Sequence, residues 1–456
     1  MRKYFGTDGI RRIANTELTP ELVYRVAKAG AYVLSKHTDH TPTILIGRDT
    51  RISGTLIESA MTAGFLSYGA NVKILGVIPT PGVAYLTKKL KADASVVISA
   101  SHNTYEFNGV KYFSNKGMKI PDELEEEIEE IMDSGKLEEL TAVNDKIGVS
   151  EIRTDLLDEY VYFFRKNFEE DFEDLNRENF VVAIDTANGA TSEVATKVFT
   201  ALGIKHYILN NTPNGVNINE NCGSTHLDML KKYVVENKCN LGIAYDGDGD
   251  RCLAIDDKGN EIDGDKLLAV ISNYMKEKGT LRNDTLVATV MSNLGLKKYA
   301  EKNNVNYAET KVGDRYVLEE MLKNGYNLGG EQSGHIIMLD YNPTGDGILT
   351  SLMLVKILLE KGVQSSKLCD IIQIYPQVLI NAKVDSDKKN GYKEDSEIKE
   401  EIEKLEKEFA GNGRVLIRPS GTEPLVRVMI EGQDKNYIEE KAKSLAKMIE
   451  NKLLSK

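Results

Sequence analysis

Cysteine is scarce in this sequence, and its spacing excludes two common uses of the residue. No two of the four cysteines form a Cys-x-x-Cys pair; they are Cys222, Cys239, Cys252 and Cys369. A structural zinc site or a disulfide framework needs closely spaced or paired cysteines. We therefore expect neither.

Long apolar runs are also missing. The N-terminal stretch MRKYFGTDG contains no apolar region of the kind found in secretory signals. No stretch approaches the ~18 consecutive apolar residues of a membrane span. We expect a cytoplasmic protein that has no membrane partner.

Positive charge is in deficit. The chain has 58 Lys and Arg residues against 70 Asp and Glu residues, a formal net charge of −12. Such a charge disfavours nucleic acid and anionic membranes as partners. It would also repel a small anionic ligand, so a site for one must be locally basic. The residues placed to make it so are Arg11, Arg48, Lys111, Arg251, Lys311, Arg418 and Arg427.

Short apolar, β-branched runs alternate with helical stretches along most of the chain. These runs are residues 43–46, 72–77, 95–98, 180–184, 241–244 and 286–290. The alternation is typical of parallel sheets built from βαβ units. At 456 residues the chain also exceeds what one hydrophobic core usually serves.

The fold class predicted from this pattern is α/β, with three similar α/β domains that have mixed, largely parallel sheets, plus a smaller C-terminal α+β domain. The expected boundaries are 1–150, 151–255, 256–367 and 368–456. In the last domain, residues 415–417 and 426–430 read as strands. The acidic segments 122–134 and 394–409 carry apolar residues at helical spacing, which predicts amphipathic helices with solvated charged faces.

Two of the apolar runs end in polar segments that could carry chemistry. The run at 95–98 leads to Ser101-His102-Asn103, and the run at 241–244 leads to DGDGDR at residues 246–251. Ligands of such sheets sit beyond the carboxyl ends of the strands. Glycines permit the tight, positive-φ backbone that lets Asp246, Asp248 and Asp250 converge, and carboxylate oxygens are what Mg²⁺ prefers.

The aspartate segment has two competing interpretations. An EF-hand calcium loop would need glycine at its sixth position and glutamate at its twelfth, where this sequence has Arg251 and Asp257. A solvated surface turn is the simpler alternative, because aspartate and glycine are the residues that turns favour.

Three further segments have the donor set of a phosphate site. Residues 418–427 read RPSGTEPLVR and combine arginine forks, hydroxyls and glycine backbone. Residues 5–11 and 47–54 follow a similar pattern, although each alone could equally be a plain loop.

In this order and at this spacing, the segments resemble those of the α-D-phosphohexomutase superfamily, from about Arg2 to Gly432. The segments FGTDGIR, CGSTH, KVGDRYV and GGEQSGH resemble most closely the branch that acts on glucosamine phosphates. The chain departs from the family pattern at Arg12, Thr104 and Phe107, which puts the rigidity of the serine loop in question.

The resemblance implies an enzyme that interconverts glucosamine 6-phosphate and glucosamine 1-phosphate through a bisphosphorylated sugar. Ser101 would carry an activating phosphate, and one Mg²⁺ per chain would be held by a phosphoserine oxygen with Asp246, Asp248 and Asp250. A homodimer is usual in the family. The alternatives are a phosphomannomutase or phosphoglucomutase and, from another class, a non-catalytic phosphosugar-binding protein.

The resemblance also implies roles for further residues. Each domain would carry one loop: the serine loop, the metal loop, the sugar loop and the phosphate loop, in chain order. Sugar binding falls to Arg251, Glu331 and Ser333, and phosphate binding to Arg418, Ser420, Gly421, Thr422 and Arg427. The candidates for proton transfer are Lys111, Arg11 and His335, where a structural role for the histidine is equally open.

Overall fold

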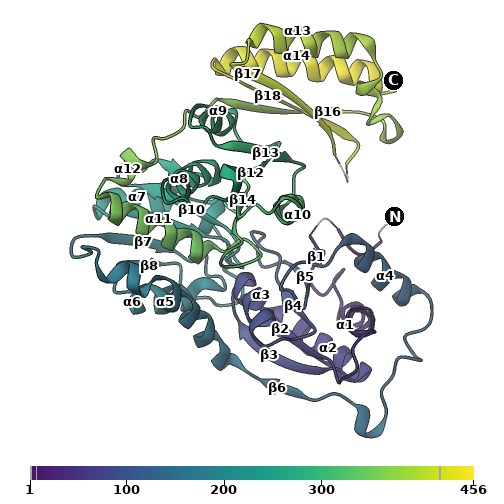
Figure 1. Ribbon diagram of the computed structural model, residues 1–456. Helices are drawn as coiled ribbons and strands as arrows, with labels where there is room; N and C mark the ends of the chain where they lie inside the picture. The colour runs from purple at the N-terminus through teal and green to yellow at the C-terminus, as the bar shows by residue number, and fades with distance from the viewer. Residues whose placement is uncertain (1–2, 7, 421–422, 456) are drawn as a thin grey trace. The chain divides into compact units, whose positions relative to one another are not determined.

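A computed structural model describes residues 3–6, 8–420 and 423–455 (Figure 1). Three α/β domains with mixed, largely parallel sheets are followed by a smaller domain with an antiparallel sheet, which confirms the predicted fold class. The chain forms two compact units, one of residues 1–291 with 305–371 and one of residues 292–304 with 372–456. No helix within the described ranges is long and apolar enough to cross a membrane.

The first sheet has the strand order β1-β5-β4-β2-β3-β6. Its central strands are parallel, whereas β1 and β5 run antiparallel to their neighbours. Helices α1, α2 and α4 pack together around one apolar core. The elements are β1 (Ile10–Ile13), α1 (Pro20–Ser35), β2 (Thr43–Arg48), α2 (Gly54–Tyr68), β3 (Asn71–Val77), α3 (Thr80–Lys89), β4 (Ala94–Ile98), β5 (Phe107–Ser114), α4 (Asp122–Asp133) and β6 (Ser150–Ile152).

The second sheet has the order β11-β10-β9-β7-β8. Strand β9 is parallel to β7, but β10 returns antiparallel beside β9, so that residues 246–251 form the connection of a hairpin. The elements are α5 (Leu157–Glu173), β7 (Val181–Asp185), α6 (Thr191–Ala201), β8 (Lys205–Leu209), α7 (Asp228–Glu236), β9 (Leu241–Tyr245), β10 (Cys252–Asp256) and β11 (Glu261–Ile262).

The third sheet repeats this arrangement, with the order β13-β12-β14-β15. Strand β14 is parallel to β12 and antiparallel to β15, so that residues 331–335 again connect a hairpin. The elements are α8 (Gly264–Glu277), β12 (Thr285–Thr289), β13 (Asn306–Thr310), α10 (Asp314–Asn324), β14 (Leu328–Gly330), β15 (Ile336–Met338), α11 (Gly347–Lys361) and α12 (Ser365–Leu368).

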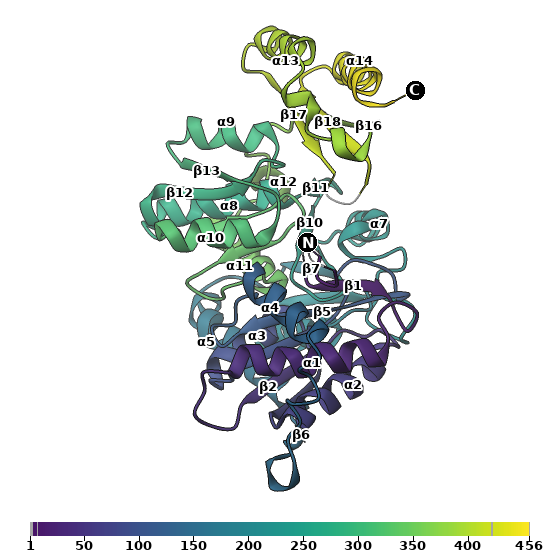
Figure 2. The same cartoon turned by 90° about the vertical axis from the view of Figure 1, so that its right-hand side faces the viewer.

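The second unit is built on an antiparallel sheet with the order β16-β18-β17. Helices α13 and α14 lie on one face of this sheet in both views of the ribbon (Figures 1 and 2). The two predicted strands of this domain are confirmed as β17 and β18. The elements are α9 (Leu294–Lys302), β16 (Gln377–Lys383), α13 (Ser396–Phe409), β17 (Gly413–Pro419), β18 (Leu425–Gly432) and α14 (Lys435–Leu453).

The prediction that the acidic face of α4 is solvated is wrong at two positions. Glu125 and Glu129 are 3% and 9% exposed. Glu129 accepts hydrogen bonds from the backbone N–H groups of Lys3, Tyr4 and Phe5 at 2.6 to 2.7 Å. The helix has the predicted amphipathic core face, but part of its charged face fixes the N-terminal segment instead of facing water.

Helix α11 is anchored to the loop after β9 by its first turn. The Gly347 N–H donates to the carbonyl oxygen of Gly249 at 3.0 Å. The fully buried carboxylate of Asp346 caps this helix by accepting from Leu349 N at 3.0 Å, and it also accepts from the Tyr160 hydroxyl at 2.8 Å. The cap therefore joins α5 and α11 next to the aspartate loop.

This cap generates a prediction about stability and pH. Burial raises the pKa of Asp346 from its ordinary value of 3.8 to about 6, against the opposing effect of its hydrogen-bond donors. The native state then binds a proton that the unfolded chain has released, so the contribution of Asp346 to stability is full below pH ~4 and is lost as the pH rises through ~6. As the pH rises from ~4 to above ~6, the free energy of unfolding of Asp346→Asn should therefore increase by up to about 3 kcal/mol relative to that of the natural chain.

Urea denaturation of both proteins at several pH values from 4 to 7 would measure this difference. Because other groups titrate alike in the two proteins, their effects cancel. A difference in unfolding free energy that does not change with pH would contradict the assignment.

Candidate functional site

Ser101 lies in a strained turn three residues beyond the end of β4. Its φ of 52° is in the left-handed region, which costs a non-glycine residue about 1–3 kcal/mol and persists only where the surroundings enforce it. The Ser101 N–H donates to Ser99 Oγ at 2.9 Å, and Ser99 in turn donates to Asp49 Oδ2 at 2.6 Å. The side chain of Ser101 is thereby presented from a fixed backbone.

The buried guanidinium of Arg51 holds the whole serine loop. It donates to the carbonyl oxygens of Ser101 at 3.0 Å, Asn103 at 2.8 Å and Phe107 at 3.0 Å, and also to that of Thr104. Its Nε pairs with Asp49 Oδ2 at 2.8 Å, with both side chains fully buried. Since the contacts at 104 and 107 are made by backbone atoms, the unusual side chains at these two positions do not remove the anchor.

The aspartate loop meets the serine loop directly. Ser101 Oγ donates to Asp246 Oδ2 at 2.7 Å. One carboxylate oxygen from each of Asp246, Asp248 and Asp250 lies within 4.8 Å of the others. A Cβ at Gly247 would lie 2.6 Å from the Ser101 carbonyl oxygen, and Gly249 has a φ of 70°. The two glycines therefore permit the approach of the loops and the turn between the carboxylates.

The three carboxylates have the properties of a cation site. They are 0%, 1% and 4% exposed in chain order, which excludes a solvated surface turn. Asp248 Oδ1 and Asp250 Oδ1 are buried and have no hydrogen-bond partner among the described residues. Burial, and then the charges of Asp250 and Asp248, raise the pKa of Asp246 far above its ordinary range. A hard divalent cation would supply both the missing partner and the missing positive charge.

Lys111 brings an ammonium group to the same cluster. It projects from β5, is 2% exposed, and lies 3.0 Å from Asp248 Oδ2 and 3.2 Å from Asp8 Oδ2. Burial alone would lower its pKa, but the carboxylates of Asp248 and Asp8 outweigh that effect and raise it. Lys111 is therefore charged in this arrangement and can donate a proton or stabilise negative charge.

Arg11 shares its carboxylate partner with Lys111. Its guanidinium donates to Asp8 Oδ2 and to Asn103 Oδ1, both at 3.0 Å. Arg251 also reaches the serine loop, with Nη1 3.3 Å from His102 Nδ1. Burial, followed by the charges of Arg251 and Arg11, lowers the pKa of His102 to about 4, so this imidazole is neutral and accepts.

The hairpin loop between β14 and β15 supplies the predicted sugar residues. Glu331 Oε1 accepts from the Gly313 N–H at 3.1 Å, and Ser333 Oγ is buried with no hydrogen-bond partner in the described ranges. His335 Nε2 accepts from the Gly345 N–H at 3.0 Å, while its Nδ1 lies 3.4 Å from Asp250 Oδ2. With both ring nitrogens engaged, His335 fits the structural role better than proton transfer.

The predicted phosphate loop lies in the second unit, between β17 and β18. Arg418 and Arg427 face each other directly in the strand register. Burial and the charge of Arg427 lower the pKa of Arg418, so an anion between them would relieve a repulsion. Ser420 is 5% exposed, and its carbonyl oxygen accepts from Lys389 Nζ at 3.1 Å. Gly421 and Thr422 lie outside the described residues.

Sequence reasoning gave no specific role to several residues that the structure places at the site. Thr80 Oγ1 donates to Asp248 Oδ2 at 2.7 Å, and Asn219 Nδ2 donates to the Ser101 carbonyl oxygen at 2.8 Å. Asp8 and Arg51 lie in segments singled out as phosphate donors, but they are committed to partners in the protein. Their pairing with residues up to about a hundred positions away left no local signal in the sequence.

The family described as phosphoglucomutase/phosphomannomutase matches almost the whole chain. Its alpha/beta/alpha domains I, II and III match residues 2–139, 158–259 and 263–375, and its C-terminal domain matches residues 379–449. A phosphoglucosamine mutase from Ruminiclostridium cellulolyticum is 52% identical over 453 residues, which cover 99% of this chain and 100% of the relative. One from Acetivibrio thermocellus is 52% identical with the same coverage.

Solved structures share the fold. A phosphoglucomutase/phosphomannomutase family protein from Burkholderia thailandensis aligns with a TM-score of 0.81 at 20% identity, over 98% of this chain and 97% of that one. An N-acetylphosphoglucosamine mutase from Aspergillus fumigatus, in complex with GlcNAc-6P and magnesium, aligns with a TM-score of 0.71 at 16% identity. The alignment covers 99% of this chain and 96% of the fungal one.

The anchor of the serine loop generates a prediction. Arg51→Met should destabilise the protein by about 3–5 kcal/mol, because it leaves the buried carboxylate of Asp49 without its counter-ion. The matched control is Arg153→Met, which removes an equally well-formed pair, with Asp155 at 2.9 Å, that is exposed to solvent. Urea denaturation should give a much lower free energy of unfolding for Arg51→Met than for Arg153→Met. Equal, small effects would mean that the buried pair does not hold the loop.

Proposed function

The chain belongs to the phosphoglucosamine mutase family of phosphohexomutases, and on that premise we propose that it interconverts glucosamine 6-phosphate and glucosamine 1-phosphate through a phosphoserine at Ser101. One observation carries the proposal: the Ser101 hydroxyl lies 2.7 Å from a buried carboxylate of a three-aspartate cluster. The product would feed amino-sugar nucleotide and cell-wall precursor synthesis in the cytoplasm. A homodimer belongs to the same proposal.

Ser101 enters the cycle already phosphorylated. A serine hydroxyl is a weak nucleophile toward a phosphomonoester, and the hydroxyl here donates to Asp246. In the first transfer, the bond between phosphorus and Ser101 Oγ breaks and one forms to a sugar hydroxyl, whose proton leaves as Ser101 regains one. The second transfer returns the other phosphate of the bisphosphorylated sugar to Ser101.

Asp246, Asp248, Asp250 and a phosphoserine oxygen would hold one Mg²⁺ per chain. When bound, the cation polarises the transferring phosphoryl group and neutralises the negative charge that gathers around it. The magnesium in the complex of the fungal mutase supports this choice of cation. Lys111, 3.0 Å from Asp248, adds a fixed ammonium to the same centre, which suits a loose transition state that needs positioning and charge stabilisation.

The remaining site residues divide between the sugar and its second phosphate. We assign the unpartnered Ser333 hydroxyl and Glu331 to the sugar hydroxyls, and Arg251 to orientation of the ring. Arg418, Ser420, Gly421, Thr422 and Arg427 hold the phosphate that is not being transferred. Such a clamp must accept either end of the bisphosphate, and paired arginines do so because they recognise a phosphate and not the sugar. Lys111 and Arg11 move the protons, with His335 positioning Asp250.

Replacement of Ser101 tests the phosphoserine. Ser101→Ala should abolish mutase turnover while leaving the fold intact, since it removes one hydroxyl from a loop and no core volume. Ser59→Ala, on the exposed surface of α2, is the control and should keep full activity. A coupled assay across glucosamine, glucose and mannose phosphates would also test the substrate. Substantial residual turnover in Ser101→Ala would rule out the phosphoserine mechanism.

The metal site has its own test. Chelation should stop activity and Mg²⁺ should restore it. Asp248→Asn should raise the half-saturating Mg²⁺ concentration by at least about 10- to 100-fold, because loss of a residue that only orients a metal ligand already costs that much. Asp257→Asn is the control, because that carboxylate accepts from Ser366 N at 2.7 Å and is not one of the three clustered aspartates. If metal-free protein turned over at the original rate, the three aspartates would have a structural role only.

A further inference from the structure

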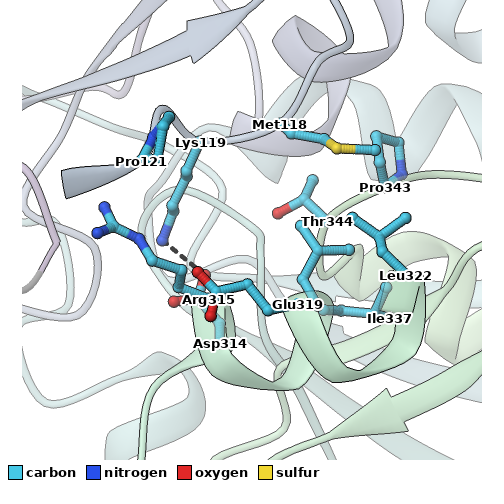
Figure 3. A pocket seen from close by; sticks show the side chains of 11 residues that line it. Met118, Lys119, Pro121, Asp314, Arg315, Glu319, Leu322, Ile337, Pro343 and Thr344 are labelled. Atoms are coloured by element: carbon cyan, nitrogen blue, oxygen red, sulfur yellow. Dashed lines mark hydrogen bonds and ion pairs between the residues drawn. The ribbon is translucent and has the colours of Figure 1, made fainter. Parts of the chain in front are cut away.

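Lys119 bridges two carboxylates that belong to different domains. Its ammonium lies 2.5 Å from Asp8 Oδ1 and 2.6 Å from Asp314 Oδ2. Figure 3 shows Lys119 reaching from the segment after β5 toward Asp314 at the start of α10. The lysine side chain is 14% exposed and that of Asp314 is 19% exposed. The bridge is therefore largely removed from solvent.

Each carboxylate of the bridge is connected to the reaction centre through further side chains. Asp8 is shared with Lys111 at 3.2 Å and with Arg11 at 3.0 Å. Asp314 Oδ2 lies 3.5 Å from His335 Nε2, and His335 Nδ1 lies 3.4 Å from Asp250. Lys119 is thus linked through Asp8 to Lys111, the proposed proton donor, and through Asp314 to His335, which contacts the aspartate cluster at Asp250.

The first turn of α10 is fixed to the same segment of the first domain by a second contact. Arg315 donates to the carbonyl oxygen of Ile120 at 3.0 Å and pairs with Glu125 at 3.5 Å. On the other side of Asp314, the Gly313 N–H donates to Glu331, the residue assigned to the sugar. The turn that receives Lys119 therefore also positions the sugar loop.

One other cation, Arg315, lines the cleft beside Lys119, and it is already paired with Glu125. The rest of the cleft is lined by Glu319, Thr344 and mostly apolar side chains, including Leu318. Figure 3 shows Met118, Leu322, Ile337 and Pro343 among them. A missing ammonium would leave Asp8 and Asp314 facing each other with one cation fewer. Asp8 would then draw the Lys111 ammonium away from Asp248. Asp314, next to His335 Nε2, would compete with Asp250, next to Nδ1, for interaction with the imidazole.

We propose that Lys119 is a positioning residue for phosphoryl transfer, which it supports by neutralising Asp8 and Asp314 and so keeping Lys111 and His335 on the aspartate cluster. The inference rests on the proposed function. It assigns to Lys119 no contact with the substrate. Its loss should therefore lower kcat far more than it changes KM.

The test is a single-turnover measurement with protein phosphorylated at Ser101, confirmed by intact mass, and saturating glucosamine 6-phosphate. Lys119→Met should slow transfer on the order of 10- to 100-fold, the cost of a displaced catalytic group. Lys119→Arg keeps the charge and should recover most of the rate. Adding Asp314→Asn to Lys119→Met removes the Asp314 carboxylate, which has lost its Lys119 partner, and should restore part of the transfer rate.

The control is Lys356→Met, which breaks a lysine–aspartate pair of the same 2.6 Å length and similar lysine burial, 12% exposed, on α11. It should transfer phosphate at the rate of the natural chain. If Lys119→Met matched that rate, or if Lys356→Met slowed transfer equally, the positioning role would be wrong. If Lys119→Met did not fold, the double variant Lys119→Met/Asp314→Asn, in which Asp8 still lacks the Lys119 charge, should transfer phosphate more slowly than the natural chain, and a natural rate would equally overturn the role. Failure of the natural chain to transfer phosphate would instead refute the proposed function.

Discussion

The close approach of two loops from different domains is the contact on which the rest of the site depends. The hydrogen bond from Ser101 to Asp246 joins the serine loop to the aspartate loop. The loops can approach this closely because Gly247 has no side chain. Every other group at the centre is placed relative to this contact. Arg51 fixes one loop from within the first domain, and the capped start of α11 fixes the other through the Gly249 carbonyl oxygen.

Charge balance explains why so many ionisable groups can be buried together. The three aspartates of the cluster have Lys111 and Arg251 as cationic neighbours, and burial, followed by the charges of Asp250 and Asp248, raises the pKa of Asp246. A divalent cation would offset the negative charge of the cluster, whereas a phosphoserine would add to it, so cation and phosphate are expected to depend on each other. Lys119 balances Asp8 and Asp314, whereas Lys111 is shared between Asp8 and Asp248 of the cluster. In a chain of net charge −12, Arg11, Lys111 and Arg251 supply positive charge at the serine and aspartate loops, where an anionic sugar would otherwise be repelled.

The sequence predicted the parts of this molecule that are encoded locally. Short apolar runs marked the buried strands, and their ends marked where Ser101 and the aspartates would lie, because parallel strands deliver their carboxyl ends to one edge. The hairpin returns of β10 and β15 were not predicted, since a buried antiparallel strand has the same composition as a parallel one. The Asp8–Lys119–Asp314 bridge and the four-carbonyl anchor of Arg51 join residues distant in sequence, and no local pattern identifies them. The acidic residues of α4 were misread for the same reason: periodicity finds the apolar face but does not say which charges on the other face have partners.

The most direct test of the account follows the phosphate itself. Protein labelled with radioactive phosphate at Ser101 would be mixed with excess unlabelled glucosamine 6-phosphate and stopped within one turnover. The account predicts that the label appears first in the bisphosphorylated sugar and then at O1 of glucosamine 1-phosphate, while the protein becomes phosphorylated again without label. Label that stays on the protein, or leaves as inorganic phosphate while mutase turnover continues, would contradict it.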